Sequence, residues 1–320
     1  MKRRLVWVGL ATLGGMLLSR AIPAQPPTQL TLLTARPGSL YERAGQALRQ
    51  VLQRQGFNIT VKESPGSVFN LEQLAQGKAD LALAQKDAFV FYKNLGTQQR
   101  ASADNLTVIG PVNQEVIHIL VRPGMRSLGQ LRGKRIGVGP QDSGTYVSAL
   151  LVLQMADLDV TRERLITGEI RQGIQDLQAG KLDVLFVTAG LGAPQLQQMP
   201  ARAQVELLAF DSAALTQAKK VFPEAAALYR LMTIPARTYP WQPRPVSALA
   251  TYSCLFARRS LPQPLVYRLT QTLSQQQQAL RQADPFWALL TLDRRQDTYT
   301  GGLTYHAGVQ QFLHEQKVSR

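Results

Sequence analysis

The chain has 320 residues, 45% of them hydrophobic, with 36 basic and 21 acidic residues and a formal net charge of +15. This length and apolar content allow a sizeable core and favour two domains. The basic residues are scattered rather than gathered into a stripe, and no nucleic-acid-binding motif is present, so nucleic acid is not an expected partner. The only cysteine, Cys254, excludes an intramolecular disulfide.

Residues 1–24 have the pattern of a cleavable secretory signal. Basic residues at 2–4 precede an apolar run over 5–18, and small residues and prolines follow it. The run is shorter than the roughly 20 residues that a membrane span needs. We expect cleavage after Ala21 or Ala24, with no cysteine there to carry a lipid anchor, and therefore a periplasmic product. An uncleaved anchor or a misassigned start codon are the alternatives.

The first half of the remaining chain alternates short apolar runs with helical periodicity. We predict strands over 30–34, 57–61, 79–84 and 106–111, with helices over 41–55 and 68–75 between them. Gly56 is placed to end the first helix. This order of strands and helices predicts a mainly parallel sheet covered by helices.

A second unit with the same rhythm begins at a strand predicted over 116–121, where His118 is expected to be a core or hinge residue. Its further elements are predicted over 127–131, 135–138, 144–155, 171–179 and 184–188. Both units contain the order helix, glycine, lysine, aspartate, strand, at 74–84 and at 177–187. This repeated order predicts two lobes of related architecture. Lobe 1 covers 28–115, and lobe 2 with the hinge return covers 116–250.

The C-terminal part contains little chemistry. We predict a strand over 246–257, a long helix over 263–282 and a final helix over 309–317, with 251–320 returning to lobe 1. The glutamine run at 275–278 is interpreted as a solvated helix face.

Five segments place glycine and hydroxyl residues where a strand is expected to meet a helix or loop, at 34–41, 64–70, 139–145, 188–190 and 233–240. A helix start has free backbone N–H groups and the positive end of the helix dipole. Several starts that converge on one cleft form a site for a carboxylate or another anion. The pattern therefore predicts a small anionic ligand. Helix capping without a ligand is the alternative for Ser67, Ser143 and Thr145.

No catalytic residue, metal site or other cofactor is expected. His118, His306 and His314 are far apart in sequence and lack metal-ligand spacing. A triad of Ser143, His118 and Asp142 is disfavoured, because the local sequence is not a nucleophile elbow. Cys254 is expected in a buried strand rather than in a reactive loop. The sequence thus predicts a binding protein rather than an enzyme.

In order and spacing, the segments resemble the TAXI family, the extracytoplasmic solute receptors of TRAP (tripartite ATP-independent periplasmic) transporters. The resemblance covers essentially the whole mature length. Its motifs are Gly-Ser-Val-x-Asn at 66–70, Asp-Leu-Ala-Leu-Ala-Gln at 80–85, Ser-Gly-Thr at 143–145, Ala-Gly-Leu at 189–191 and Thr-Ile-Pro-Ala-x-Thr-Tyr-Pro at 233–240.

The resemblance implies an α/β, two-lobed fold of the type II periplasmic-binding-protein kind, with mixed, mainly parallel sheets flanked by helices and a ligand cleft between the lobes. It further implies a monomer that captures a small organic carboxylate, such as an acidic amino acid or a keto or dicarboxylic acid. The receptor would deliver this solute to TRAP permease subunits, fused or separate. The alternatives are a receptor for an ATP-driven (ABC) importer of sulfonates or pyrimidine-like solutes, and a periplasmic ligand sensor without transport.

The resemblance also assigns ligand contacts. On lobe 1 they are Gly38, Ser39, Tyr41, Gly66, Ser67, Asn70 and Gln85. On the opposite wall they are Ser143, Gly144, Thr145, Thr188, Ala189 and Gly190, with Tyr239 closing one end.

The chain departs from the family pattern at several positions. Arg36 lies in a stretch that is glycine-rich in relatives. Glycine is also common in relatives at the positions of Pro65, Asp142, Arg237 and Trp241. The Arg36 guanidinium could bind a carboxylate in forked geometry, or it could be a solvated loop residue. The negative charge of Asp142 would disfavour an anion or recruit an amine.

Overall fold

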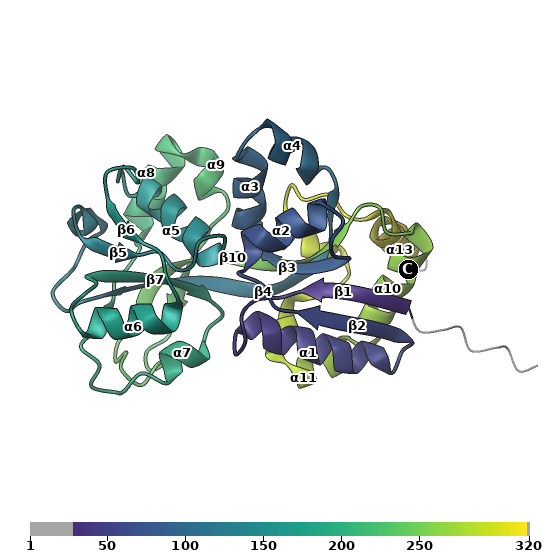
Figure 1. Cartoon of the computed structure of the whole chain (residues 1–320), viewed down its shortest axis with the longest axis horizontal. Helices are drawn as coiled ribbons and strands as arrows, with labels where there is room; N and C mark the ends of the chain where they lie inside the picture. Colours follow the sequence, from purple (N-terminus) through teal and green to yellow (C-terminus); the bar gives the residue numbers. More distant parts are fainter. Residues whose placement is uncertain (1–27, 319–320) are drawn as a thin grey trace, which may run out of the picture.

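Two lobes lie side by side and are joined by two long strands (Figure 1). The computed structural model describes residues 28–318, so the expected signal segment is outside the described residues. The joining strands are β4 (Leu106–Val121) and β10 (Val246–Arg258), which pair antiparallel over residues 106–116 and 250–258. No helix within 28–318 has the length and apolar character that a membrane crossing requires.

Lobe 1 is built on parallel strands β1 (Thr28–Leu33), β2 (Phe57–Lys62) and β3 (Leu81–Gln85). Helix α1 (Leu40–Gln53) covers one face of them, and α2 (Ser67–Ala75), α3 (Lys86–Asn94) and α4 (Thr97–Ala103) lie on the other (Figure 1). In β3, Leu81 and Leu83 pack in the core with α1, whereas Ala82 and Ala84 pack with α2. This alternation follows from the two-residue period of a strand.

Lobe 2 repeats the arrangement. Strands β5 (Arg135–Gly137), β6 (Arg164–Ile166) and β7 (Val184–Ala189) are parallel, and α5 (Gly144–Met155) and α6 (Ile170–Gln178) pack on opposite faces. Its shorter elements are η1 (Leu128–Leu131), α7 (Pro194–Gln197), β8 (Glu206–Leu207), α8 (Ser212–Val221), α9 (Pro223–Ala226) and β9 (Arg230–Ile234).

One continuous sheet runs through both lobes in the order β2-β1-β3-β10-β4-β7-β5-β6. It is parallel toward both ends and antiparallel around β4 and β10, so the predicted parallel character holds only for the outer strands. The two strands predicted over 106–111 and 116–121 are one strand, because 113–115 continue the pairing with β10. The β4–β10 pair therefore connects the two lobes within one sheet.

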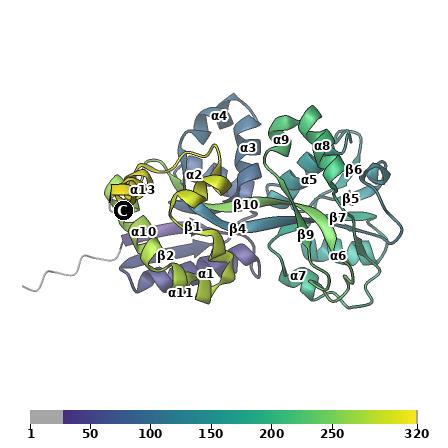
Figure 2. The ribbon, with the colours of Figure 1, turned by 180° about the vertical axis from the view of Figure 1, so that it is seen from behind.

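The C-terminal segment covers lobe 1 (Figure 2). The single helix predicted over 263–282 is two helices, α10 (Gln263–Gln275) and α11 (Gln277–Ala283), with a break at Gln276. After η2 (Pro285–Leu289), η3 (Arg294–Gln296) and α12 (Asp297–Thr300), helix α13 (Ala307–Val318) places Val309 and Phe312 in the lobe 1 core.

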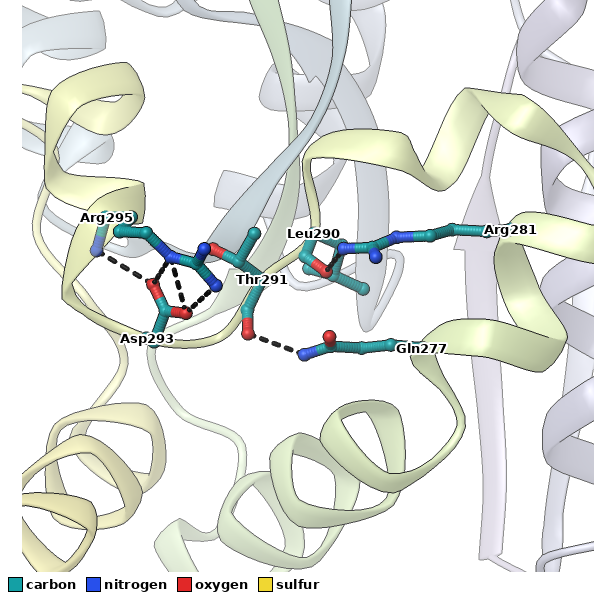
Figure 3. A network of polar contacts seen from close by, with 6 residues as sticks. All are labelled: Gln277, Arg281, Leu290, Thr291, Asp293 and Arg295. Carbon is teal, nitrogen blue, oxygen red and sulfur yellow. Dashed lines mark hydrogen bonds and ion pairs between the residues drawn. The ribbon is translucent and has the colours of Figure 1, made fainter. Parts of the chain in front are cut away.

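Part of the glutamine run is half-buried rather than fully solvated. The Gln277 amide donates to the Thr291 carbonyl at 2.5 Å, and Arg281 donates to the Leu290 carbonyl at 3.4 Å (Figure 3). These contacts bind α11 to the segment that follows η2.

The repeated sequence order corresponds to a repeated structure. Gly77 and Gly180 end their helices with φ of +73° and +71°. Asp80 then accepts from the Thr31 backbone and the Arg258 guanidinium, and Asp183 accepts from the backbone and guanidinium of Arg135. In each lobe an aspartate thus connects the start of a strand to its neighbours.

Candidate functional site

A cavity of about 250 Å³ lies between the lobes and is lined by residues of both. Four helices begin at its wall: α1 after Ser39, α2 after Gly66, α5 after Ser143 and α6 after Glu169. Their dipoles direct partial positive charge into the cavity. The sequence predicted all four helix starts to within one residue, but it assigned only the first three to the cleft.

The hydroxyl residues at these starts also have structural roles. Ser39 and Ser143 each accept, through Oγ, from a backbone N–H in the first turn at 3.1 Å, as helix caps do. Ser67 Oγ accepts from the Gln85 N–H, and Thr145 Oγ1 from the Thr188 N–H, both at 3.1 Å. Each of these hydroxyls can also donate a hydrogen bond through its own O–H.

Backbone donors remain free at the start of α5. Within the described chain, the N–H groups of Gly144 and Thr145 have no hydrogen-bond partner, as expected for the first residues of a helix. Both residues line the cavity. An anion bound here would satisfy them directly.

Charged side chains lie on the solvent-exposed side of the cavity. Arg36 Nη1 of lobe 1 is 2.8 Å from Glu169 Oε1 of lobe 2, and about half of each side chain is exposed. Arg171 also lines the cavity and is exposed. Sequence reasoning missed Glu169 and Arg171, because β6 before them was not predicted and the helix was expected to begin one residue later.

The lobes touch directly beside the cavity. The backbone N–H groups of Val68 and Phe69 donate to the Asp142 carbonyl at 3.0 and 3.3 Å. A Cβ added at Gly144 would lie 2.1 Å from the end of the Gln85 side-chain amide, in the facing lobe. The arrangement is therefore a closed one, and a side chain at position 144 would require the Gln85 amide to move.

The buried carboxylate of Asp87 joins the two lobes through hydrogen bonds next to this contact. Asp87, at the start of α3 in lobe 1, accepts from Ser148 Oγ at 2.6 Å and from the Tyr229 hydroxyl at 2.7 Å, both in lobe 2. Burial raises the pKa of the Asp87 carboxyl, and the hydrogen bonds from Ser148 and Tyr229 partly oppose this rise.

Glu115 is a cavity-lining residue that sequence reasoning missed. It lies in the middle of β4 with 2% of its surface exposed, and its Oε1 has no hydrogen-bond partner within the described residues. Burial raises the pKa of its carboxyl to about 8, although Ser253, Asn113 and Tyr41 favour the ionised form. The sequence signal for Glu115 was an acidic residue inside a long apolar strand. It was missed because 112–115 lay between the two predicted strands.

Most residues assigned by resemblance line the cavity, although lining alone does not demonstrate a ligand contact. They are Arg36, Gly38, Ser39, Tyr41, Gly66, Ser67, Gln85, Ser143, Gly144, Thr145, Thr188 and Ala189.

Asn70, Gly190 and Tyr239 are outside the lining. Asn70 Nδ2 donates to the Thr34 and Leu83 carbonyls at 2.6 and 2.8 Å and so joins the ends of β1 and β3. A Cβ added at Gly190 would lie 2.8 Å from Asn113 Nδ2. The Tyr239 ring is buried and stacks on Trp241 with centroids 5.4 Å apart. These contacts are local and structural, and the ligand contacts that the resemblance assigns to the three residues stay predictions.

The geometry does not assemble a hydrolytic triad. His118 Nδ1 is 3.1 Å from the Val187 carbonyl, and its Nε2 is 2.7 Å from the Tyr239 hydroxyl, so both ring nitrogens are engaged away from Ser143. Burial lowers the pKa of His118 to about 4. Cys254 is fully buried, and burial raises the pKa of its thiol to about 12. Residues 28–318 contain no group of three or more His, Cys, Asp or Glu residues that could hold a metal ion.

Known structures share this architecture. The periplasmic aliphatic sulphonate binding protein SsuA from Escherichia coli is 17% identical, with a TM-score of 0.51 over 90% of this chain and 83% of its own. The alkanesulfonate-binding protein SsuA from Xanthomonas axonopodis pv. citri, bound to MOPS, is 19% identical, with a TM-score of 0.50 over 91% and 85%. PhnD1 from Prochlorococcus marinus, in complex with methylphosphonate, is 12% identical, with a TM-score of 0.50 over 82% and 90%.

These similarities, at low identity, establish the fold as that of type II periplasmic binding proteins, as the sequence predicted. The model of the NMT1-like family matches residues 32–316, which is most of the chain. The chain therefore belongs to the NMT1-like family.

Proposed function

We propose that this protein is an exported receptor that captures a small organic carboxylate between its lobes and delivers it to a TRAP-type membrane transporter. The observation that carries the proposal is the convergence of four helix starts on one interlobe cavity. The ordered motifs that resemble TAXI receptors support the transporter type.

The cavity offers the donors that a carboxylate needs. The free N–H groups of Gly144 and Thr145 lie in the positive field of α5. Arg36, which pairs with Glu169, and Arg171 bring guanidinium donors to the exposed side of the cavity. A ligand held between these groups would contact both lobes and would stabilise the closed arrangement, because it binds that arrangement better than the open one.

A receptor for an ATP-driven importer of sulfonates is the second candidate. The structural similarity to the two SsuA proteins, whose names refer to sulfonates, favours it. Carboxylate and sulfonate would use the same backbone donors, so the choice between the candidates depends on measured affinity.

The test is a binding screen of residues 25–320, unfolded and refolded to remove any copurified solute. Amino acids, keto acids, dicarboxylates and sulfonates are compared by thermal shift and then by calorimetry. A ligand at one hundred times its Kd stabilises the native state by about 2.7 kcal/mol. Binding of carboxylates supports the proposal, binding of sulfonates alone supports the second candidate, and no binding of any anion contradicts both.

Two variants locate the site. Arg36→Ala and Arg171→Ala should each weaken anion binding about tenfold, because each removes a charge-assisted partner. Arg54→Ala removes an exposed positive charge at the end of α1, outside the cavity lining, and is the matched control. Equal affinity in all three variants would remove Arg36 and Arg171 from the site.

The transporter assignment needs its own experiment. Uptake of the identified solute into vesicles that contain the membrane subunits should depend on this receptor and on an ion gradient. Uptake that requires ATP instead would support the importer reading.

A further inference from the structure

The inner part of the cavity differs chemically from the helix starts. Three of its lining residues each have a buried side-chain oxygen without a hydrogen-bond partner within the described chain: Tyr41 Oη, Glu115 Oε1 and Thr188 Oγ1. Each of these residues is at least nine-tenths buried. Unpartnered buried polar atoms are uncommon in folded proteins, and here they gather at one cavity.

The three oxygens come from different elements that the fold brings together. Glu115 is on β4 and Thr188 is on β7, where Thr188 pairs with Ile117, two residues along from Glu115. Glu115 and Thr188 therefore face the same side of the sheet as diagonal neighbours. Tyr41, in the first turn of α1, is close enough for its hydroxyl to lower the pKa of the Glu115 carboxyl.

We infer that Glu115, with the hydroxyls of Tyr41 and Thr188, forms a subsite for an ammonium group, so that the solute is an α-amino acid rather than a keto acid or a dicarboxylic acid without an amino group. This inference rests on the proposed function, since it takes the helix starts as the carboxylate subsite. An ammonium carries three N–H donors, and the subsite offers three acceptor oxygens. The cavity thus presents donors to one end of a zwitterion and acceptors to the other.

Charge balance favours a zwitterion over a simple anion. An ionised Glu115 would repel an anionic solute in a cavity of low dielectric, whereas it would pair with an ammonium. The other titratable groups that face Glu115 are Tyr41 from α1 and Asp87 from α3. Both Asp87 and Tyr41 have pKa values raised by burial, and neither supplies a positive charge. A cation from the solute would therefore be the ionic partner of Glu115.

Matched pairs of solutes test the inference on the full mature chain. Each pair is an amino acid and its 2-keto analogue: L-glutamate with 2-oxoglutarate, L-leucine with 4-methyl-2-oxopentanoate, and L-alanine with pyruvate. In any pair that binds, the amino acid should bind at least about 30-fold more tightly, because it alone has the buried ionic partner. Equal or tighter binding of the keto acid would overturn the inference and leave the proposed carboxylate receptor intact. Binding of neither class would reject both.

Glu115→Gln identifies the responsible residue. It keeps the shape of the side chain but removes its negative charge, so affinity for the preferred amino acid should fall about 30-fold or more while that for its keto analogue does not fall. Glu224→Gln is the matched control, because Glu224 is exposed at α9 and lies outside the interlobe cavity. An unchanged preference for the amino acid in Glu115→Gln would contradict the assignment.

Proton release gives an independent readout. An ammonium that ionises a protonated Glu115 should release close to one proton per ligand at pH 7, and amino-acid affinity should rise up to about tenfold per unit from pH 6 to 7. Calorimetry in two buffers of different ionisation enthalpy measures the released proton, and Glu115→Gln should abolish the release. Proton uptake, or affinity that falls with pH, would mean that a protonated Glu115 donates to the solute, and would overturn the inference.

Discussion

Gly66 and Ser143 meet across the two lobes: a Cβ added at Gly66 would lie 3.0 Å from the Ser143 Cα atom. Gly66 has φ of +140°, which residues with a Cβ rarely adopt. Backbone conformation and the approach of lobe 2 therefore both require glycine here. The contact makes the closed arrangement sensitive to a single methyl group.

Replacing Gly66 with alanine should hinder closure. We expect affinity for the bound solute to fall about tenfold or more, because closing the lobes would force the methyl group against the backbone of Ser143. The measurement is Kd by calorimetry, together with the radius of gyration from small-angle X-ray scattering at saturating solute.

Gly77→Ala is the matched control for Gly66→Ala. Gly77 has φ of +73° in the same lobe, but a Cβ there would meet nothing within 4 Å. Its substitution should cost about 1 kcal/mol of stability and leave affinity unchanged. If Gly66→Ala loses no more affinity than Gly77→Ala, the closure argument fails.

The free energy of unfolding should respond to Glu115 through pH. The carboxyl has a pKa of about 8 in the folded chain against an ordinary value of 4.5. The folded state therefore holds a proton that the unfolded state releases, and stability from this group is lost as pH rises between these values. Without ligand, Glu115→Gln should gain stability relative to the natural chain by roughly 1 kcal/mol per pH unit over this range.

Urea unfolding of the ligand-free proteins at pH 5 and pH 8 measures this difference. Glu224→Gln should show the same small effect at both pH values, because Glu224 is exposed. A stability difference between Glu115→Gln and the natural chain that does not change with pH would show that Glu115 is ionised in the folded, ligand-free protein.

Asp183 should have the opposite pH dependence. Its carboxylate accepts from the backbone N–H and the guanidinium of Arg135, and these bonds hold its pKa at about 2, below the ordinary 3.8. The stabilisation is present above the ordinary value and is lost as pH falls through 2. Asp183→Asn should destabilise the chain by about 1–2 kcal/mol at pH 7 and by much less at pH 2.

Chemical denaturation at pH 7, 4 and 2 follows this loss. Arg135→Lys separates charge from geometry, because lysine keeps the positive charge but lacks the forked donors. We expect it to retain only part of the stabilisation. An equal cost of Asp183→Asn at all three pH values would assign its effect to packing rather than to the ion pair.

Much of the fold could be predicted because local sequence determines local structure. The helix predicted over 144–155 has the bounds that the structure has, and the helix predicted from 68 begins one residue earlier, at Ser67. Three of the four helix starts at the cavity wall were assigned to the cleft from sequence. The backbone N–H groups of the site could therefore be predicted. The strand break expected near 112–115 was wrong, since pairing with β10 maintains the strand through polar residues.

The side-chain parts of the site depend on contacts between distant residues. Asp87 and Tyr229 are hydrogen-bonded across 142 positions, and no local pattern predicts that pair. The hydrogen bond between the Tyr239 hydroxyl and His118 in the lobe 2 interior likewise joins residues 121 positions apart. Glu115 was missed for the same reason, because its importance follows from burial by two lobes rather than from its neighbours in sequence.

Arg237 provides a test of backbone strain. It stands where glycine is common in the TAXI pattern, and its φ is +62°, in the left-handed region that costs a non-glycine residue roughly 1–2 kcal/mol. The side chain is exposed, and the backbone N–H donates to the Gln242 carbonyl at 2.9 Å. Arg237→Gly removes the strain and keeps this bond, so it should stabilise the chain by about 0.5–1 kcal/mol after the entropy cost of glycine. Arg237→Ala keeps the strain but loses the charge, so it should not stabilise the chain. Urea unfolding measures both variants. Equal stabilisation by the two would assign the gain to charge removal rather than to backbone conformation.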